Sequence, residues 1–336
     1  MRYLVPCVEQ LDRAAIELHE DSVVSARLAL ILTDNIVELM VHRRCETIFG
    51  RKAPAWICEP PEAKYNRAAQ HRVLGRHFDP KLKFLKSEGD ISEAEYNFII
   101  RCHDVRGEAY HTGLAYDEIL RPLAWHYHEL ACALFARLQT STRSYNPRAP
   151  ISERYAAHLP AQIRDNKYSA YAMGVESQIA ESLHVARPSL PLTFKESLAK
   201  HLSDSLERME MLLGIIKRAR PDGYSIDREI VEAQWSIDLY ANVPVDIEFH
   251  SGTYREHISR KVTTMRNQWS PKHSLLSIGP WKKRIQQLKQ ADTYSALQRY
   301  FSIMCEVEIL LAPIESIVGG IEARAEAQIE RNRSNR

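Results

Sequence analysis

Arg106 and His111 are the two residues whose types and spacing could do chemistry, in the stretch HDVRGEAYHTG at 103–113. Histidine titrates near neutral pH, so its imidazole can accept or donate a proton. The arginine guanidinium is a fork of N–H donors that stabilises charge building on phosphoryl oxygens. Together they suit metal-free cleavage of RNA, in which the ribose 2′-hydroxyl attacks the phosphorus.

A structural interpretation of the same pair stays open. Arg106 can be a surface arginine paired with Asp104 or Glu108, and His111 can be a histidine stabilised by the dipole at a helix C-terminus. Five positions on an ideal helix rotate by about 500°, which leaves the two side chains roughly 140° apart. Either the helix bends or ends before His111, which Gly113 permits, or a second copy of the chain completes the site.

The segments around this pair predict an all-α protein. The chain has 336 residues but only 12 glycines, which suits long helices joined by short loops. Residues 22–49 have helical spacing with nearly all faces apolar, as in the central helix of a bundle. Ser92 and Glu95 form a Ser-x-x-Glu capping box that opens the helix carrying Arg106.

We expect two domains from the length of the chain and from one polar segment. Residues 1–140 form the predicted N-terminal helical bundle. Residues 141–150 are polar and proline-containing, and we predict a linker there. Residues 151–336 also have helical patterning, and we expect a second helical domain of unknown role.

Two acids on the long apolar helix are candidate supporting residues. Asp34 and Glu38 lie four positions apart, and buried acids are costly unless they are paired. One interpretation is that they orient an arginine of the later helix, such as Arg106 or Arg101. The other is that they lie on a solvated strip, or pair with the basic residues that follow at positions 42 and 43.

Four residues of the motif helix are further candidates for substrate binding or support. Arg101 and His103 could extend a phosphate-binding cleft, although an exposed polar helix face would explain them equally well. Glu108 and Tyr110 lie between the two candidate catalytic residues.

Composition limits the other functions. Lysine and arginine number 45 against 43 acids, a formal net charge of +2, so binding of duplex through many phosphates is not expected. Six cysteines without a CxxC pair predict reduced thiols in a cytoplasmic protein. No apolar run is long enough for a membrane span.

We find no nucleotide-binding or zinc-protease motif and expect neither metal nor cofactor. His126 and His128 should not share an ion, because on a helix they lie about 200° apart.

The first 140 residues resemble the HEPN family. The resemblance is carried by Arg106-x4-His111 late in a helical bundle, by the long apolar helix containing Asp34, Asn35 and Glu38, and by the order of the helices over residues 8–140. The family usually has a polar residue directly after the arginine, where this chain has Gly107. A tyrosine that one subgroup carries two places after the histidine is replaced here by Gly113.

The resemblance implies an endoribonuclease that needs no metal and cuts RNA by 2′-hydroxyl attack in a homodimer cleft. It implies Arg106 and His111 as the catalytic residues, a toxin or phage-defence role, and a possible regulatory or antitoxin protein as partner. The alternative it leaves open is a non-catalytic adaptor that binds RNA or protein. A purely helical scaffold with a fortuitous motif is the third possibility.

Overall fold

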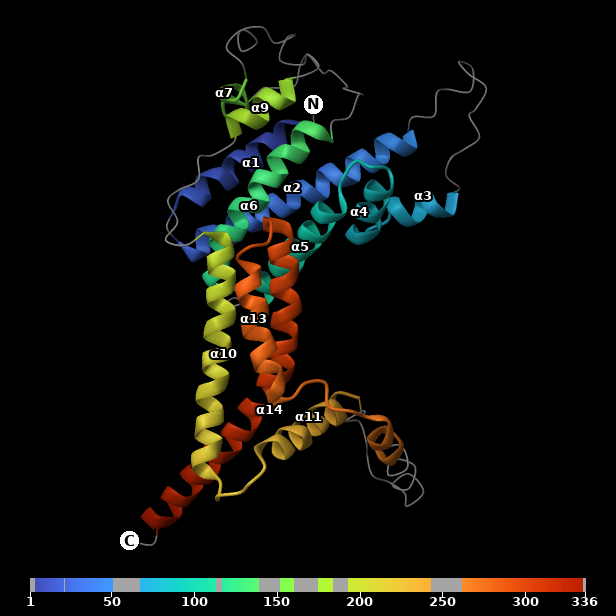
Figure 1. The fold of residues 1–336 in the computed structure, drawn as a ribbon. Coiled ribbons are helices and arrows are strands. Elements are labelled where there is room, and N and C mark those ends of the chain that lie inside the picture. The colour runs from blue at the N-terminus through green and yellow to red at the C-terminus, as the bar shows by residue number, and fades with distance from the viewer. Residues whose placement is uncertain are drawn as a thin grey trace. The chain divides into compact units, whose positions relative to one another are not determined.

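The computed structural model describes residues 4–20, 22–50, 67–112, 117–138, 152–159, 175–183, 193–242 and 262–334. For residues 109–112, at the end of one helix, only the backbone is described. Every regular element in these ranges is a helix, which confirms the all-α fold class (Figure 1). None of these helices is long and apolar enough to cross a membrane.

The chain divides into two compact units. Unit 1 comprises residues 1–197 and 293–298, and unit 2 comprises residues 198–292 and 299–336. The division falls inside a helix, between residues 197 and 198. The segment 141–150, where we expected a linker, lies outside the described residues, and the linker stays a prediction. The helices of unit 1 are α1 (Leu4–His19), α2 (Val23–Gly50), α3 (Arg67–Leu74), α4 (Phe78–Ser87), α5 (Glu93–Thr112), α6 (Asp117–Arg137), α7 (Glu153–Ala157) and α9 (Val175–Leu183).

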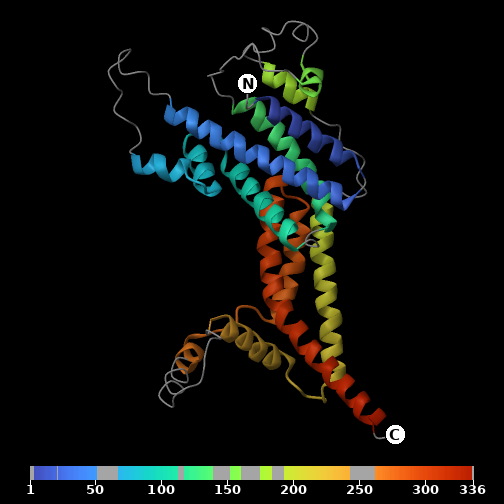
Figure 2. The ribbon, with the colours of Figure 1, turned by 180° about the vertical axis from the view of Figure 1, so that it is seen from behind.

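The long helix α2 is the centre of unit 1. It packs against α1, α3, α4, α5 and α6, and both views show it alongside α1 and α6 (Figures 1 and 2). Ser22 precedes it, and the Ser22 hydroxyl lies 3.5 Å from the backbone N–H of Ser25, as expected for an N-terminal cap. The spacing of apolar residues over 22–49 thus correctly predicted a central helix.

The motif helix α5 begins as its capping box predicts. The Ser92 N–H donates to the Glu95 carboxylate at 2.8 Å, and the Glu95 N–H donates to the Ser92 hydroxyl at 3.2 Å. The neighbouring α4 starts at Phe78 and contains Asp79 and Pro80 in its first turn, where a proline costs no helical hydrogen bond.

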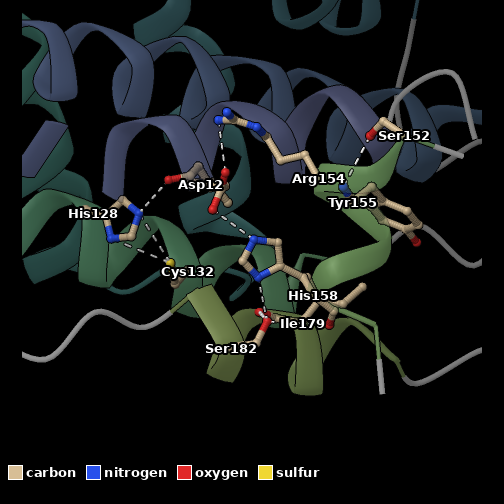
Figure 3. A network of polar contacts seen from close by, with 10 residues as sticks. Asp12, His128, Cys132, Ser152, Arg154, Tyr155, His158, Ile179 and Ser182 are labelled. Atoms are coloured by element: carbon tan, nitrogen blue, oxygen red, sulfur yellow. Dashed lines mark hydrogen bonds and ion pairs between the residues drawn. The ribbon is translucent and has the colours of Figure 1, made fainter. Parts of the chain in front are cut away.

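Two short helices are fixed to α1 by one polar network (Figure 3). His158 follows α7, and its Nε2 lies 2.9 Å from an Asp12 carboxylate oxygen of α1. Its Nδ1 lies 3.0 Å from the Ser182 hydroxyl of α9, and Arg154 pairs with Asp12 at 3.0 Å. The Ser182 hydroxyl also donates to the Ile179 carbonyl at 2.7 Å. The Ser182 hydroxyl proton is thus used in a hydrogen bond within α9 and is not donated to His158. We interpret the network as a structural link between helices.

Unit 2 is held by side chains that link its long helices. Its helices are most of α10 (Phe194–Ala219), α11 (Ile226–Asn242), a helical turn at 262–268, the 3₁₀ turn η2 (Leu275–Ser277), α13 (Ile278–Leu288) and most of α14 (Thr293–Ser334). Glu306 of α14 accepts hydrogen bonds from the Trp281 indole at 2.8 Å and from Arg284 at 2.7 Å, both on α13. His201 of α10 lies 2.6 Å from the Tyr300 hydroxyl of α14.

Candidate functional site

Asp34 is a fully buried acid at the centre of a polar cluster in unit 1. One carboxylate oxygen accepts the Tyr127 hydroxyl at 2.8 Å. The other lies 3.0 Å from Nδ1 of His103 and 3.3 Å from Nε of Arg106. A buried carboxylate is tolerated only when such partners replace its hydration. Asp34 is therefore not on a solvated strip of α2, and its contacts include Arg106.

Glu38 and Asn35 extend the cluster toward solvent. Glu38 lies 3.3 Å from Nδ1 of His103 and 3.8 Å from a terminal nitrogen of Arg106, and its side chain is 37% exposed. Arg106 also donates to the Asn35 side-chain oxygen at 3.2 Å. The guanidinium is thus held by two carboxylates and an amide of α2.

Helical spacing explains why these side chains meet. Positions 34 and 38 of α2 are one turn apart, as are positions 103 and 106 of α5, so each pair shares a helix face. Helix α6 supplies Tyr127 from the buried side. The Phe78 ring of α4 packs on the His103 ring, with centroids 5.0 Å apart, which limits its rotation. Four helices therefore fix the geometry of the cluster.

The environment shifts several pKa values in this cluster. The hydrogen bond to Asp34 raises the pKa of His103, more than burial lowers it, and Glu38 contributes in the same direction. Burial raises the pKa of Glu38, and the nearby Asp34 adds to that effect. Burial and the adjacent Asp34 raise the pKa of Tyr127 well above its ordinary value, so its hydroxyl stays a hydrogen-bond donor. The cluster thus contains two carboxyl groups, one guanidinium group and one imidazole with a raised pKa.

A pocket of about 450 Å³ borders the cluster between α1, α2 and α4. Asn35 and Glu38 line it together with Leu39 and Phe78. Its volume is within the range of small-molecule sites, roughly 300–1,000 Å³. The exposed edge of the cluster therefore opens onto a space large enough for a ligand.

The other predicted residues of α5 lie outside this cluster or outside the described side chains. Arg101 is exposed and pairs with Asp104 at 3.3 Å, so Asp104 is not the partner of Arg106. Glu108 is exposed. The side chains of Tyr110 and His111 are outside the described part of the structure, and only their helical backbone is given.

The backbone of α5 still constrains His111. The helix runs to Thr112, so it does not end before the histidine. On a regular helix, positions 106 and 111 remain roughly 140° apart. Gly107 has open space where a side chain would begin, so no steric contact requires glycine at that position.

Two residues of the cluster were not assigned a role from the sequence. Asn35 was noted only as part of the apolar helix, although its neighbour Asp34 was a candidate. Tyr127 lies between His126 and His128 in AWHYHEL, and from the sequence we considered only metal binding by these two histidines. A tyrosine on an otherwise buried helix needs a polar partner, and this requirement is the signal that could have linked it to Asp34. His128 is itself buried, with Nε2 3.1 Å from the Leu11 carbonyl.

Comparison of the chain with protein-family models, curated proteins and solved structures finds no match.

Proposed function

We propose that the chain is a metal-independent endoribonuclease of the HEPN type, in which Arg106 binds the scissile phosphate and His111 transfers the proton. The observation that carries the proposal is the placement of Arg106. Asp34, Asn35 and Glu38 hold it, and two of these three residues, Asn35 and Glu38, line a pocket. A guanidinium oriented before substrate arrives can stabilise charge in the transition state without reorganising.

The site needs a second copy of the chain in this proposal. Because α5 continues as a helix through position 111, one chain does not bring the two side chains to the same face. The exposed face of α2 beside the cluster includes Leu28 and Leu39, which are 38% and 45% exposed. A two-fold interface on this face would bring two motif helices together and cover apolar surface.

The proposed role is that of a toxin or phage-defence ribonuclease, with a regulatory or antitoxin protein as a further partner. RNA is the substrate because the internal nucleophile is the 2′-hydroxyl. The pocket of about 450 Å³ that Asn35 and Glu38 line is of a size that suits one nucleotide. The resemblance described from the sequence supports this role.

The test is cleavage of a labelled mixed RNA pool by the purified full chain in excess EDTA. We expect cleavage with 2′,3′-cyclic phosphate ends, and its loss in Arg106→Ala and in His111→Ala. Arg106→Lys should also lose most activity, since one ammonium cannot replace the contacts to Asp34 and Asn35 together. Arg101→Ala is the matched control, because Arg101 is an exposed arginine of the same helix paired with Asp104.

Equal cleavage by the wild type and by both alanine variants would contradict the assigned roles. The alternative function is a non-catalytic adaptor that binds RNA or protein. The contacts of Arg106 with three side chains of its own bundle favour the adaptor, because they give this arginine a role in stabilising the fold. The adaptor predicts RNA or protein binding without cleavage by any of the variants, and no growth arrest on overexpression.

A further inference from the structure

Three side-chain atoms that could bind a metal ion lie close together, from Asp34, Glu38 and His103. Two carboxylate oxygens and one imidazole nitrogen all lie within 4.8 Å of one another. Among the described residues this is the one group of histidine, cysteine and acidic side chains with such spacing. The set is distinct from the catalytic pair proposed above.

The two separations from His103 are close to those between ligands of a small tetrahedral cation. His103 Nδ1 lies 3.0 Å from the Asp34 oxygen and 3.3 Å from the Glu38 oxygen. Zinc binds imidazole nitrogen and carboxylate oxygen at about 2.0–2.2 Å, so two ligands on a tetrahedral ion are separated by roughly 3.3 Å. His103 is therefore at a suitable distance from each carboxylate to share an ion with it, and the two carboxylate oxygens lie within 4.8 Å of each other.

The surroundings of the ligands also suit a metal. Tyr127 donates to the other oxygen of Asp34, which leaves the oxygen facing His103 in a fixed orientation. Such hydrogen bonds to metal-binding carboxylates strengthen metal sites. The Phe78 ring packs against His103, whereas Glu38 and His103 stay partly exposed, at 37% and 30%. The site is therefore rigid on its buried side and open to an ion on the other.

Arg106 is the cation that now contacts both carboxylates. Its contacts to Asp34 and Glu38 are 3.3 and 3.8 Å long, whereas a close ion pair between arginine and carboxylate has contacts of about 2.7–2.9 Å. We propose that the cluster binds one zinc ion through Asp34, Glu38 and His103, in competition with Arg106. Binding displaces the guanidinium from the carboxylates, and His103 coordinates the ion through Nδ1 as a neutral imidazole. This inference does not depend on the proposed function.

The test is titration of the full chain with zinc chloride by calorimetry, in a non-coordinating buffer with reduced thiols. We expect one saturable site, which Glu38→Gln and His103→Gln abolish. Tyr127→Phe should weaken it by about tenfold, as loss of an outer-shell hydrogen bond does. Arg106→Ala should bind zinc more tightly, because the competing charge is gone.

Two controls separate this site from adventitious binding. Glu46→Gln removes an exposed acid of the same helix, which pairs with His42, and Cys305→Ser removes an exposed thiol. Both variants should bind zinc like the wild type. Cobalt bound in place of zinc should give tetrahedral d–d bands without thiolate charge transfer.

Absence of binding by the wild type would overturn the inference, as would equal binding by correctly folded Glu38→Gln and His103→Gln. Circular dichroism of each variant checks the fold. The readout is binding and not RNA cleavage, so its failure is distinguishable from failure of the ribonuclease.

Discussion

At the scale of single residues, the buried carboxylate of Asp34 determines which side chains meet at the site. Its burial requires partners for the carboxylate, and Tyr127, His103 and Arg106 converge on it, which orients Arg106. The sequence placed Asp34 and Glu38 on an apolar helix but left two interpretations of them open. Periodicity assigns a residue to a helix, but not to a partner some 70 positions away, and for that reason the contacts could not be derived from the pattern.

Tyr127→Phe should destabilise unit 1 without a change in packing volume. The substitution leaves one oxygen of the buried Asp34 carboxylate without its hydroxyl donor, which costs about 2 kcal/mol in the free energy of unfolding. Urea unfolding followed by circular dichroism measures this loss. Tyr240→Phe is the control, because Tyr240 is 77% exposed, and it should change stability by less than about 0.5 kcal/mol. Equal stability of the two variants would show that the Tyr127 hydroxyl does not support Asp34.

At the scale of helices, local start signals identified where helices begin, whereas the extent of a unit does not follow from local sequence. Ser22 and the Ser92–Glu95 pair mark true helix starts because capping is a local interaction. The extent of unit 1 depends on which helices pack together, which is non-local. His158 illustrates this, because it joins α7 and α9 to α1 through an aspartate 146 positions earlier (Figure 3).

In unit 2, Glu306 should make the pairing of α13 and α14 sensitive to acid. The Arg284 hydrogen bond lowers the pKa of Glu306, with help from Trp281 and against the effect of burial. A carboxyl whose folded-state pKa is lowered stabilises the fold above its unfolded pKa of about 4.3 and loses this contribution as the pH falls through the folded value.

Glu306→Gln should therefore lower stability at pH 7 by about 1 kcal/mol and reduce the loss of stability between pH 5 and the acid range. Urea unfolding at a series of pH values measures both effects. Glu315→Gln is the control, since Glu315 pairs with an Arg208 side chain that is 62% exposed. A wild-type acid dependence in Glu306→Gln would contradict the role of this carboxylate.

At the scale of the whole molecule, the proposed activity depends on self-association through α2. Leu28→Lys places a charge on the exposed apolar face without touching Asp34 or Arg106. We expect this variant to be a monomer by light scattering and to lose RNA cleavage, because each site draws on two chains. Leu276→Lys alters a more exposed leucine, at 85%, in unit 2 and should leave both properties unchanged. A cleaving monomer would show that one chain suffices.

The cluster also has a consequence for the timing of protein synthesis. Asp34 and Tyr127 are 93 positions apart, and a ribosome that adds about 5–20 residues per second needs roughly 5–20 seconds between them. Until α6 has emerged, Asp34 lacks its buried hydrogen-bond donor and the bundle cannot close over it. A nascent chain from which α6 has not yet emerged therefore has no assembled cluster beside the messenger RNA that encodes it.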